Sequence, residues 1–258
     1  MDLGIKGRRA LVCGASQGLG FACARMLAQE GCVVILNGRD GEKLAGAAAS
    51  IRADGGEVGT IAADQTTEAG RDALIAGAGD LDILVNNNAG PSPGGLDDWD
   101  QAALLGALGA NMIPAILLMR AFIPGMRARR FGRIVNITSA MVKSPRYHQG
   151  LSTAARAGLT AIAKAISREV AVDNVTINNL LPERIDTPRQ EAMAQRIMAM
   201  QGIDRDEARC QIADSIAAKR FGRPEEFASA CAFLCGADAG FVSGQNLQVD
   251  GGSYEGLI

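Results

Sequence analysis

Residues 9–20 read RALVCGASQGLG, in which a short apolar run leads directly into three glycines. Residues 10–13 are apolar throughout and predict a buried parallel strand, while residues 21–30 predict a helix with one apolar face. The glycines between them are Gly14, Gly18 and Gly20. Glycine lets the backbone turn sharply and lets a phosphate approach the helix N-terminus, where free N–H groups and the helix dipole favour negative charge. The stretch therefore predicts a site for the pyrophosphate of a dinucleotide.

Strand and helix signals alternate along the rest of the chain. Further strands are expected at residues 32–37, 57–63, 81–86, 133–138, 175–180 and 246–250, and helices at 43–53, 67–78, 97–130, 150–172 and 224–235, with helical segments up to residue 219. Strands that alternate with helices imply right-handed crossovers, and so an α/β fold whose doubly wound parallel sheet has helices on both faces. No segment is rich enough in Pro, Ser or charge to mark a domain boundary. We therefore expect residues 1–258 to form a single dinucleotide-binding domain, with its ligand at the carboxyl ends of the strands.

The composition excludes several classes of function. With 48% hydrophobic and 21% charged residues in 258, the chain has the make-up of a globular protein that buries one core. Its formal net charge of −2 provides no general attraction to nucleic acid. The longest apolar runs are of strand length and the first residues lack the apolar core of a signal peptide. We therefore expect no membrane segment and a cytoplasmic location.

The six cysteines lack the paired spacing of a disulfide framework. Most lie in expected strands and helices, which favours buried free thiols in a reducing cytoplasm. Cys231 and Cys235 stand one helical turn apart, but no histidine lies near them in the sequence, so we expect no metal site.

Several motifs follow one another in the order in which one enzyme family carries them. They are CGASQGLG at 13–20, DILVNNNAG at 82–90, Asn111, RIVNITS at 133–139, INNLLPERIDT at 177–187, RFGRPEEFA at 220–228 and FVSGQNLQVDGG at 241–252. On these motifs the chain resembles the short-chain dehydrogenase/reductase family over nearly its whole length, and is most like the bacterial 3-oxoacyl-acyl-carrier-protein reductases. The resemblance implies a Rossmann-type, seven-stranded sheet of strand order 3-2-1-4-5-6-7, a nicotinamide cofactor, and a homotetramer or homodimer.

The resemblance also implies a set of cofactor-binding residues. They are Gly14, Ser16, Gln17, Gly18, Leu19, Gly20, Asn37, Arg39, Asp64, Gln65, Asn87, Asn88, Ala89, Gly90, Arg156, Pro182 and Thr187. The family's Asn-Asn-Ala-Gly motif has an extra Asn here, so whether Asn87 or Asn88 takes the place of the second Asn stays open. An NAD site normally has Asp or Glu at the end of its second strand to accept from the ribose 2′-OH. This chain has Asn37, Gly38 and Arg39 there. Because a guanidinium can pair with a 2′-phosphate, we expect NADP rather than NAD; the alternative is an Arg39 that only faces solvent.

The catalytic motif departs from the family pattern. In the family a Tyr follows the catalytic Ser, and a Lys lies one helical turn after that Tyr; aligned on RAGL at 156–159, these positions hold Ser152 and Arg156. The Tyr exchanges a proton with the carbonyl oxygen, and the Lys lowers the pKa of that Tyr. A serine hydroxyl is a far poorer acid, and an arginine stays charged, although it can still hydrogen-bond the nicotinamide ribose. Two members remain: Ser139 to polarise a substrate oxygen, and Asn111 to hold water or backbone in the active-site helix.

Other side chains close to this motif are candidates for the missing role. Tyr147 could place its phenol there, with His148 and Lys143 on the same loop; the alternative is that Tyr147 and His148 line the substrate pocket or a subunit contact. His148 and Ser152 are spaced i to i+4, so a base and nucleophile pair is a further hypothesis, although no carboxylate is evident to orient the histidine. Glu183 stands in the place of the Gly in the family's Pro-Gly pair, and it either acts as an acid or base beside the nicotinamide or faces solvent.

Residues 187–219 are expected to form a helical substrate lid. Met193, Ile197 and Met200 recur on one helical face, which either covers an apolar or acyl-like substrate or packs on the domain.

Two further groups of residues are candidates for contacts with partners. The basic cluster, defined as Arg127, Arg129, Arg130 and Arg133, either complements a helix dipole or docks a phosphopantetheine carrier or coenzyme A. The small-residue face consists of Ala154, Ala157, Gly158, Ala161 and Ala165. It fits the subunit interface that the family implies, or tight packing within one chain.

Two functions from different classes stay open. The retained glycines, Asn111 and Ser139 favour an NAD(P)-dependent oxidoreductase that interconverts a carbonyl and an alcohol through an atypical proton relay. The lost Tyr and Lys favour a cofactor-binding pseudoenzyme or sensor of the same fold. In either case the expected partners are small molecules, a carbonyl or acyl compound in the first, rather than nucleic acid or membranes.

Overall fold

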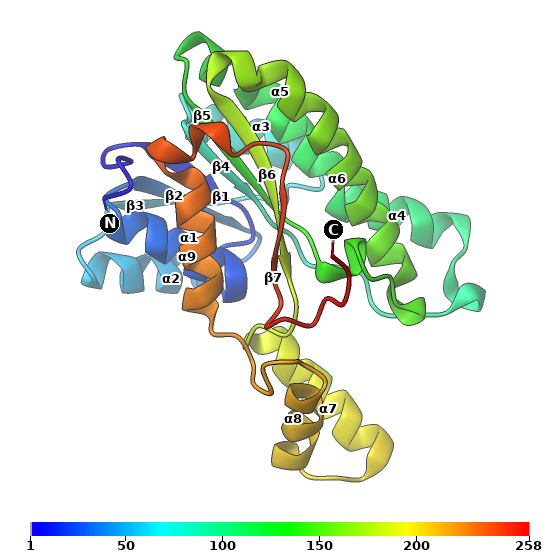
Figure 1. The fold of residues 1–258 in the computed structure, drawn as a ribbon. Helices are drawn as coiled ribbons and strands as arrows, with labels where there is room; N and C mark the ends of the chain where they lie inside the picture. The colour runs from blue at the N-terminus through cyan, green and yellow to red at the C-terminus, as the bar shows by residue number, and fades with distance from the viewer. Residues whose placement is uncertain (1, 258) are drawn as a thin grey trace.

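The seven strands of the computed structural model, which describes residues 2–257, form one parallel sheet in the order β3-β2-β1-β4-β5-β6-β7 (Figure 1). The strands are β1 (Arg9–Val12), β2 (Val33–Gly38), β3 (Val58–Ala62), β4 (Ile83–Asn86), β5 (Gly132–Ile137), β6 (Val175–Pro182) and β7 (Asn246–Val249). Every neighbouring pair is parallel. The predicted fold class and strand order are confirmed. The order reverses between β1 and β4, and in sheets of this kind ligands bind there, beyond the carboxyl ends of the strands.

Helices cover both faces of the sheet (Figure 1). One hydrophobic core holds residues of α1 (Gly18–Gln29), α2 (Gly41–Ala53) and α9 (Pro224–Cys235), and the other holds residues of α3 (Glu68–Ala78), α5 (Ile113–Ala128) and α6 (Gly150–Val170). A smaller cluster joins α4 (Gln101–Asn111) to the start of α6. The remaining helices, α7 (Pro188–Gln201) and α8 (Arg205–Asp214), project beyond the carboxyl edge of the sheet.

Short polar side chains set the starts of several helices. Asp40 accepts from the N–H groups of Glu42 and Lys43 and so caps α2, while Thr67 accepts from Gly70 and caps α3. The hydrogen bond from Lys43 is the main reason that the pKa of Asp40 is lowered. Each cap pairs N–H groups that the first turn of a helix leaves free.

The region from 97 to 130 is not the one long helix that we predicted. It contains a short 3₁₀ helix, η1 (Leu96–Asp98), and then α4 and α5, with Met112 between them at φ −124° and ψ −57°. Pro114 explains the break, because proline has no N–H to donate to the carbonyl of residue 110. That carbonyl instead accepts from Asn88 Nδ2 at 2.8 Å, which ties the loop after β4 to the helix break.

The same region also differs from our expectation about membranes. Among residues 2–257, one helical segment, 101–128, is long and apolar enough to cross a membrane when judged by length and composition alone. In the structure α5 buries Leu118, Met119 and Phe122 in the core on one face of the sheet. These contacts place one face of α5 in the core of the domain.

A row of asparagines crosses four strands of the sheet. Asn86, Asn136, Asn179 and Asn246 lie directly opposite one another in the register of β4 to β7. Each donates its Nδ2 to the Oδ1 of the next one, at 2.9, 3.0 and 2.8 Å. The sequence analysis did not single out this ladder, although each of the four motifs carries its asparagine at a matching position.

We expect Asn136→Ala to lower the free energy of unfolding by about 2–4 kcal/mol, because it leaves one buried donor and one buried acceptor unpaired. Urea unfolding followed by circular dichroism measures the change. Asn246→Ala at the partly exposed end of the ladder is the matched control, with an expected loss of about 1 kcal/mol. Equal losses of unfolding free energy in the two variants would contradict the prediction that the buried middle of the ladder contributes more to stability than its exposed end.

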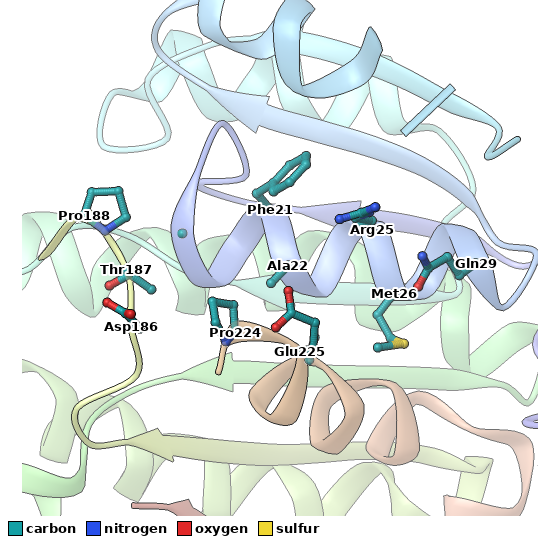
Figure 2. A pocket seen from close by; sticks show the side chains of 12 residues that line it. Phe21, Ala22, Arg25, Met26, Gln29, Asp186, Thr187, Pro188, Pro224 and Glu225 are labelled. Atoms are coloured by element: carbon teal, nitrogen blue, oxygen red, sulfur yellow. The ribbon is translucent and has the colours of Figure 1, made fainter. Parts of the chain in front are cut away.

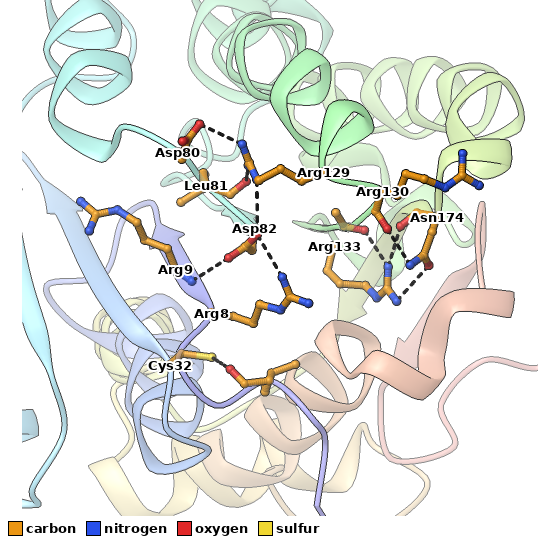
Figure 3. A network of polar contacts seen from close by, with 12 residues as sticks. Arg8, Arg9, Cys32, Asp80, Leu81, Asp82, Arg129, Arg130, Arg133 and Asn174 are labelled. Carbon is orange, nitrogen blue, oxygen red and sulfur yellow. Dashed lines mark hydrogen bonds and ion pairs between the residues drawn. The ribbon is translucent and has the colours of Figure 1, made fainter.

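The basic cluster is paired within the chain, and Figure 3 shows Arg129, Arg130 and Arg133 of this cluster with their surroundings. Arg133 is fully buried and stacks on Phe131 at 4.4 Å, and its guanidinium donates to the carbonyls of Gly236, Asn174 and Ala237 at 2.9–3.0 Å. Arg127 pairs with Asp173 at 2.6 Å, Arg129 with Asp80 at 2.8 Å, and Arg130 with Asp173 at 3.5 Å. These contacts favour a structural role over a docking patch, and they remove Arg133 from the surface altogether.

The cysteines are free thiols, as predicted, and five of them are buried; Cys210 on α8 is exposed. Burial raises the pKa of the Cys13 thiol to about 12, so this thiol stays protonated and unreactive. Within residues 2–257 no group of three or more His, Cys, Asp or Glu side chains is placed to hold a metal ion.

Candidate active site

The glycine turn between β1 and α1 has the geometry of a phosphate cradle. Gly14 and Gly18 have φ values of +57° and +62°, which only glycine adopts without strain. A Cβ on Gly20 would overlap the carbonyl oxygen of Gly14 and would stand 2.9 Å from Asn87 Nδ2. Gln17 precedes α1 without capping it by its side chain, so the first N–H groups of the helix are free to meet an anion.

A groove of about 380 Å³ begins at this turn but leads away from the candidate catalytic residues. It runs along α1 toward the start of α9 and the loop at 186–188 (Figure 2). Gly18 and Thr187 border it, and the Thr187 side chain lies 3.8 Å from the position of a Cβ on Gly18. Ser139, Ser152 and Arg156 are not among its lining residues, so the groove is not the place of the chemistry.

The end of β2 carries the residues expected to choose between NADP and NAD. Arg39 is exposed there, and Ser16 lies 3.6 Å from the position of a Cβ on Gly38. Hydrogen bonds from the backbone N–H and side-chain hydroxyl of Thr66, with a smaller contribution from Arg39, lower the pKa of Asp64. An exposed guanidinium at the end of β2 is a suitable partner for a 2′-phosphate.

Asn37 occupies a different place from the one we expected of a cofactor contact. Its side chain is buried and donates to the carbonyls of Ile61 and Ala63, at 3.2 and 2.9 Å. These bonds hold β2 against β3. The Asn37 side chain is therefore committed to the sheet, and Arg39 is the side chain of this group that is free to face a ligand.

The extra asparagine in the loop after β4 does not displace the others, because each has its own partner. Asn87 donates to the carbonyl of Gly14 at 3.1 Å, and Asn88 donates to Ala110 as described above. Gln65 donates to the carbonyl of Asn87 at 2.8 Å, and Asn111 donates to that of Ala89 at 3.2 Å. Asn111 thus holds the backbone of the loop after β4, not that of the active-site helix α6.

Ser152 and Arg156 form a buried pair on α6. Their exposed fractions are 5% and 7%, and Arg156 Nη1 donates to Ser152 Oγ. Arg156 Nη2 donates to the carbonyl of Asn88 at 3.4 Å. Burial lowers the pKa of Arg156 to about 10, and the charge of Arg189 contributes to the shift. Since it keeps its charge at neutral pH, this guanidinium can stabilise a negative charge that develops on an oxygen beside Ser152.

Ser139 and Pro182 lie at the carboxyl ends of β5 and β6. Ser139 is partly buried and caps the 3₁₀ helix η2 (Ala140–Val142), where its Oγ accepts from the N–H of Met141 at 3.2 Å. Its hydroxyl proton is free to point to a substrate oxygen. Pro182 is the last residue of β6 and pairs with Val249 of β7.

Glu183 does not face solvent, which excludes one of the two alternatives we considered. It is 7% exposed, and its Oε1 lies 3.3 Å from Nη2 of Arg146 and 3.3 Å from Nε of Arg184. Arg184 has a φ of +52°, a strained value for a residue with a side chain. The carboxylate is thus held between two guanidiniums.

The hydrogen bond and ring contacts of Tyr147 are with its neighbour His148 and the segment at 95–99, and Ser152 and Arg156 are not among these partners. It belongs to the 3₁₀ helix η3 (Tyr147–Gln149), it is 61% exposed, and its hydroxyl oxygen accepts from the N–H of Leu96 at 3.0 Å. Its ring lies 5.7 Å from that of Trp99 and 5.0 Å from that of His148. The phenol therefore secures η1. His148 makes no hydrogen bond to Ser152, which instead accepts from Arg156. Lys143 lies over the ring of Tyr254 at 5.3 Å.

The segment expected to act as a lid forms α7 and α8, which share a small core of their own. Met193 and Ile197 pack against this core around Ala208 and Ile212, whereas Met200 is 79% exposed. The apolar stripe therefore serves mainly to join α7 to α8, and whether the pair covers a substrate stays a prediction.

Three arginines around this site were missed as site residues. Arg146 lies in the segment that follows β5, at 144–149. Arg184 lies directly after β6, at 183–187, and Arg189 lies in the first turn of α7, which comes next. That position in the chain was the available signal, because residues after β5 and β6 converge at one edge of the sheet.

Known reductases resemble this chain in sequence and in fold. Residues 14–254 match the family model described as enoyl-(acyl carrier protein) reductase. The NADPH-dependent reductase BacG of Bacillus subtilis is 32% identical over 256 residues, covering 97% of this chain and 99% of BacG. The 3-oxoacyl-[acyl-carrier-protein] reductase FabG of Vibrio harveyi is 32% identical over 263 residues, covering 98% and 99%. The structure of L-sorbose reductase from Gluconobacter frateurii, complexed with NADPH and L-sorbose, superimposes with a TM-score of 0.95 at 32% identity over 100% of both chains.

Proposed function

The chain belongs to the short-chain dehydrogenase/reductase family, in the group that resembles 3-oxoacyl-acyl-carrier-protein reductases, and we propose that it is an NADPH-dependent oxidoreductase that interconverts a carbonyl and an alcohol. One observation carries this proposal. The loop at 87–90 joins the two halves of the site, because Asn87 is bonded to Gly14 of the phosphate cradle and Asn88 to Arg156 of the buried pair. A nucleotide bound at the cradle can thus extend along this loop to the Ser152–Arg156 pair, which can polarise a carbonyl oxygen.

The residues present fit the cofactor. The turn at 14–20 receives the pyrophosphate at the start of α1, where no side chain larger than hydrogen is tolerated at Gly20. Arg39 receives the 2′-phosphate, and Thr187 lies across the turn from Gly18. When bound, the nicotinamide supplies or accepts the hydride.

The chain's own residues handle the oxygen. Ser139 and Ser152 present hydroxyl groups to the substrate oxygen, and the guanidinium of Arg156 donates to Ser152 Oγ, so that the Ser152 proton is directed away from Arg156. In reduction, Ser152 gives this proton to the developing alkoxide and takes one back from water. Arg156 remains charged throughout and stabilises the oxyanion, which replaces the function of a phenol and lysine by electrostatics.

Titration of the purified protein with NADPH and NADH, followed by nicotinamide fluorescence, tests the first half of the proposal. Consumption of NADPH with a panel of ketones, oxo acids and 3-oxoacyl thioesters tests the second half. Tight NADPH binding with turnover is the expected result. Failure to bind either nucleotide would overturn the proposal.

The missing phenol favours a second candidate, a sensor that binds NADPH without hydride transfer. The two candidates differ in one observable, since the sensor binds NADPH as tightly but leaves it unoxidised with every member of the panel. The buried, charged Arg156 favours the enzyme, because a sensor has no need of a cation desolvated beside a hydroxyl.

We expect Arg39→Ala to raise the Kd of NADPH about 20-fold, since a guanidinium–phosphate pair is a strong, charge-assisted contact. The Kd of NADH, which lacks the 2′-phosphate, should stay within about twofold and is the internal control. Fluorescence titrations of both nucleotides measure the change. An equal effect on both would mean that Arg39 supports the fold of the site rather than the phosphate.

We also propose that the enzyme is a homotetramer or homodimer that works in the cytoplasm. Ala154, Ala161 and Ala165 of the small-residue face are exposed on α6, while Gly158 packs on Met112 inside the chain. On the neighbouring helix α4, Leu104 and Leu105 are 42% and 58% exposed. Apolar side chains beside a face of small residues suit a second copy of the same helices. Light scattering after size exclusion measures the mass in solution.

A further inference from the structure

Two guanidiniums meet beside Gly90, that of the buried Arg156 and that of the exposed Arg189. Nη1 of Arg156 lies 2.9 Å, and Nη1 of Arg189 lies 3.3 Å, from the point where a Cβ on Gly90 would stand. Arg156 comes from α6 and Arg189 from the first turn of α7, so the two helices direct like charges to one place. Burial lowers the pKa of Arg156, and the like charge of Arg189 adds to that shift.

The surrounding side chains do not neutralise this charge. Within residues 2–257, no Asp or Glu oxygen lies within 4.0 Å of the guanidinium of Arg156 or Arg189. Glu183 is already shared by Arg146 and Arg184, at 3.3 Å each. The charge of Arg189 also reaches Arg184, whose pKa is lowered mainly by burial. The site therefore holds four cations and one carboxylate.

Such an arrangement is costly unless a ligand supplies negative charge. Arg156 is 7% exposed, and an uncompensated charge at that depth destabilises the fold. The two anionic parts of the cofactor have their own places, the pyrophosphate at the turn of 14–20 and the 2′-phosphate at Arg39. Near Gly90 and Ser152 lie the nicotinamide end of the cofactor, which carries no negative charge, and the substrate, which is therefore the remaining source of an anion. Guanidinium groups bind carboxylates through paired hydrogen bonds of matching geometry.

We infer that the substrate is a small oxo acid whose carboxylate is bound by Arg189 together with Arg156, while its carbonyl oxygen faces Ser139 and Ser152. This inference rests on the proposed function and narrows its substrate class. Neutral ketones, esters and thioesters then bind the same pocket but leave the guanidiniums unpaired, which makes them the poorer substrates.

The test compares 2-oxo and 3-oxo acids with their methyl esters. For each acid and ester pair, kcat/KM is measured with NADPH in the unmodified protein, in Arg189→Met and in Arg196→Met. The last is a matched control, because Arg196 is an exposed arginine on the same helix without an ion pair. We expect the acid to be preferred, and the ratio of acid to ester to fall about 30-fold in Arg189→Met but less than twofold in Arg196→Met.

The Kd of NADPH in Arg189→Met separates the substrate from the cofactor as the source of the anion. A Kd within about threefold of the unmodified protein, with a lost preference for acids, supports the inference. A raised Kd with an unchanged preference overturns it and assigns Arg189 to a cofactor phosphate. An equal preference for acids and esters in the unmodified protein also overturns it, while leaving the proposed oxidoreductase activity in place.

A second readout does not depend on turnover. Oxo acids and their esters are titrated into the protein–NADPH complex, and quenching of the bound nicotinamide fluorescence is followed. Acids that bind without being reduced would support the anion site and contradict the proposed activity. Acids that bind no better than esters would contradict the anion site.

Discussion

Replacing Arg156 by methionine should reduce kcat by about 10³-fold, because its guanidinium donates to the Ser152 hydroxyl that meets the substrate oxygen. Methionine has a similar length and leaves α6 intact. Initial rates with the best substrate of the panel measure the loss. Because Arg156 also donates to the carbonyl of Asn88, the variant can weaken cofactor binding as well. The Kd of NADPH, measured by fluorescence, reports that second effect.

Arg156→Met should not lower the free energy of unfolding. Below pH 10 Arg156 is charged in the folded and the unfolded chain, so its burial is a constant cost to stability. Methionine removes that cost, and we expect the free energy of unfolding at pH 7 to be unchanged or higher. A variant that is inactive but as stable as the unmodified protein separates a chemical role of Arg156 from a structural one.

The pH profile gives the same prediction a second observable. The pKa of Arg156 is lowered to about 10, so kcat should fall as the pH rises through about 10 and the guanidinium loses its charge. The residual activity of Arg156→Met should lack this falling limb. In the same pH range the effect of Arg156 on the free energy of unfolding has the opposite sign to its effect on kcat. Above about pH 10 the unfolded chain still holds a proton that the folded chain has lost, so stability rises with pH.

Tyr147→Phe is the control for the identity of the proton donor. The Tyr147 hydroxyl accepts from the backbone N–H of Leu96, and the residue is 61% exposed. The variant should therefore keep kcat within about threefold. If instead Tyr147→Phe abolishes turnover and Arg156→Met does not, the loop carrying η3 moves its phenol into the site, and the Ser152–Arg156 relay is wrong.

The sheet could be predicted from the sequence because its signals are local. The strand at 10–13, the glycines after it and the helix that follows each depend on neighbouring residues, and the strand order followed from the resemblance. The break at Met112 also has a local cause, because Pro114 lacks the N–H that a continuous helix needs. The strong apolar pattern around it nevertheless predicted one helix. The asparagine ladder was missed because its partners are 43 to 67 residues apart.

The candidate site was less predictable because its electrostatics are set by tertiary contacts. Ser152 and Arg156 could be aligned from the sequence, and their spacing predicted one helix face, but not that Arg156 is buried and without a carboxylate. The position of Glu183 in the chain left both solvent and active site open, until Arg146 and Arg184 were seen to hold it. Arg189 carried no motif at all, and its meaning depends on the meeting of α6 and α7 at Gly90.

Gly20→Ala should raise the Kd of NADPH at least 100-fold, because a single methyl group at this position cannot be accommodated beside the carbonyl of Gly14. Either the turn at 14–20 opens, and the N–H groups that receive the pyrophosphate lose their alignment, or α1 shifts away from β1. Both responses lose the close approach on which phosphate binding at a helix N-terminus depends. Fluorescence titration measures the affinity, and urea unfolding should show a loss of about 1–3 kcal/mol.

Gly46→Ala is the matched control, since Gly46 lies exposed in the middle of α2 with open space around its Cα. Alanine there should leave the Kd of NADPH unchanged and raise the free energy of unfolding by about 0.5–1 kcal/mol, the ordinary gain of helix propensity. The contrast between the two glycines distinguishes a requirement for close backbone approach from a general effect of added methyl groups. If Gly20→Ala bound NADPH as tightly as Gly46→Ala does, the nucleotide would have to lie elsewhere than at the turn, and the groove along α1 would be the first place to look.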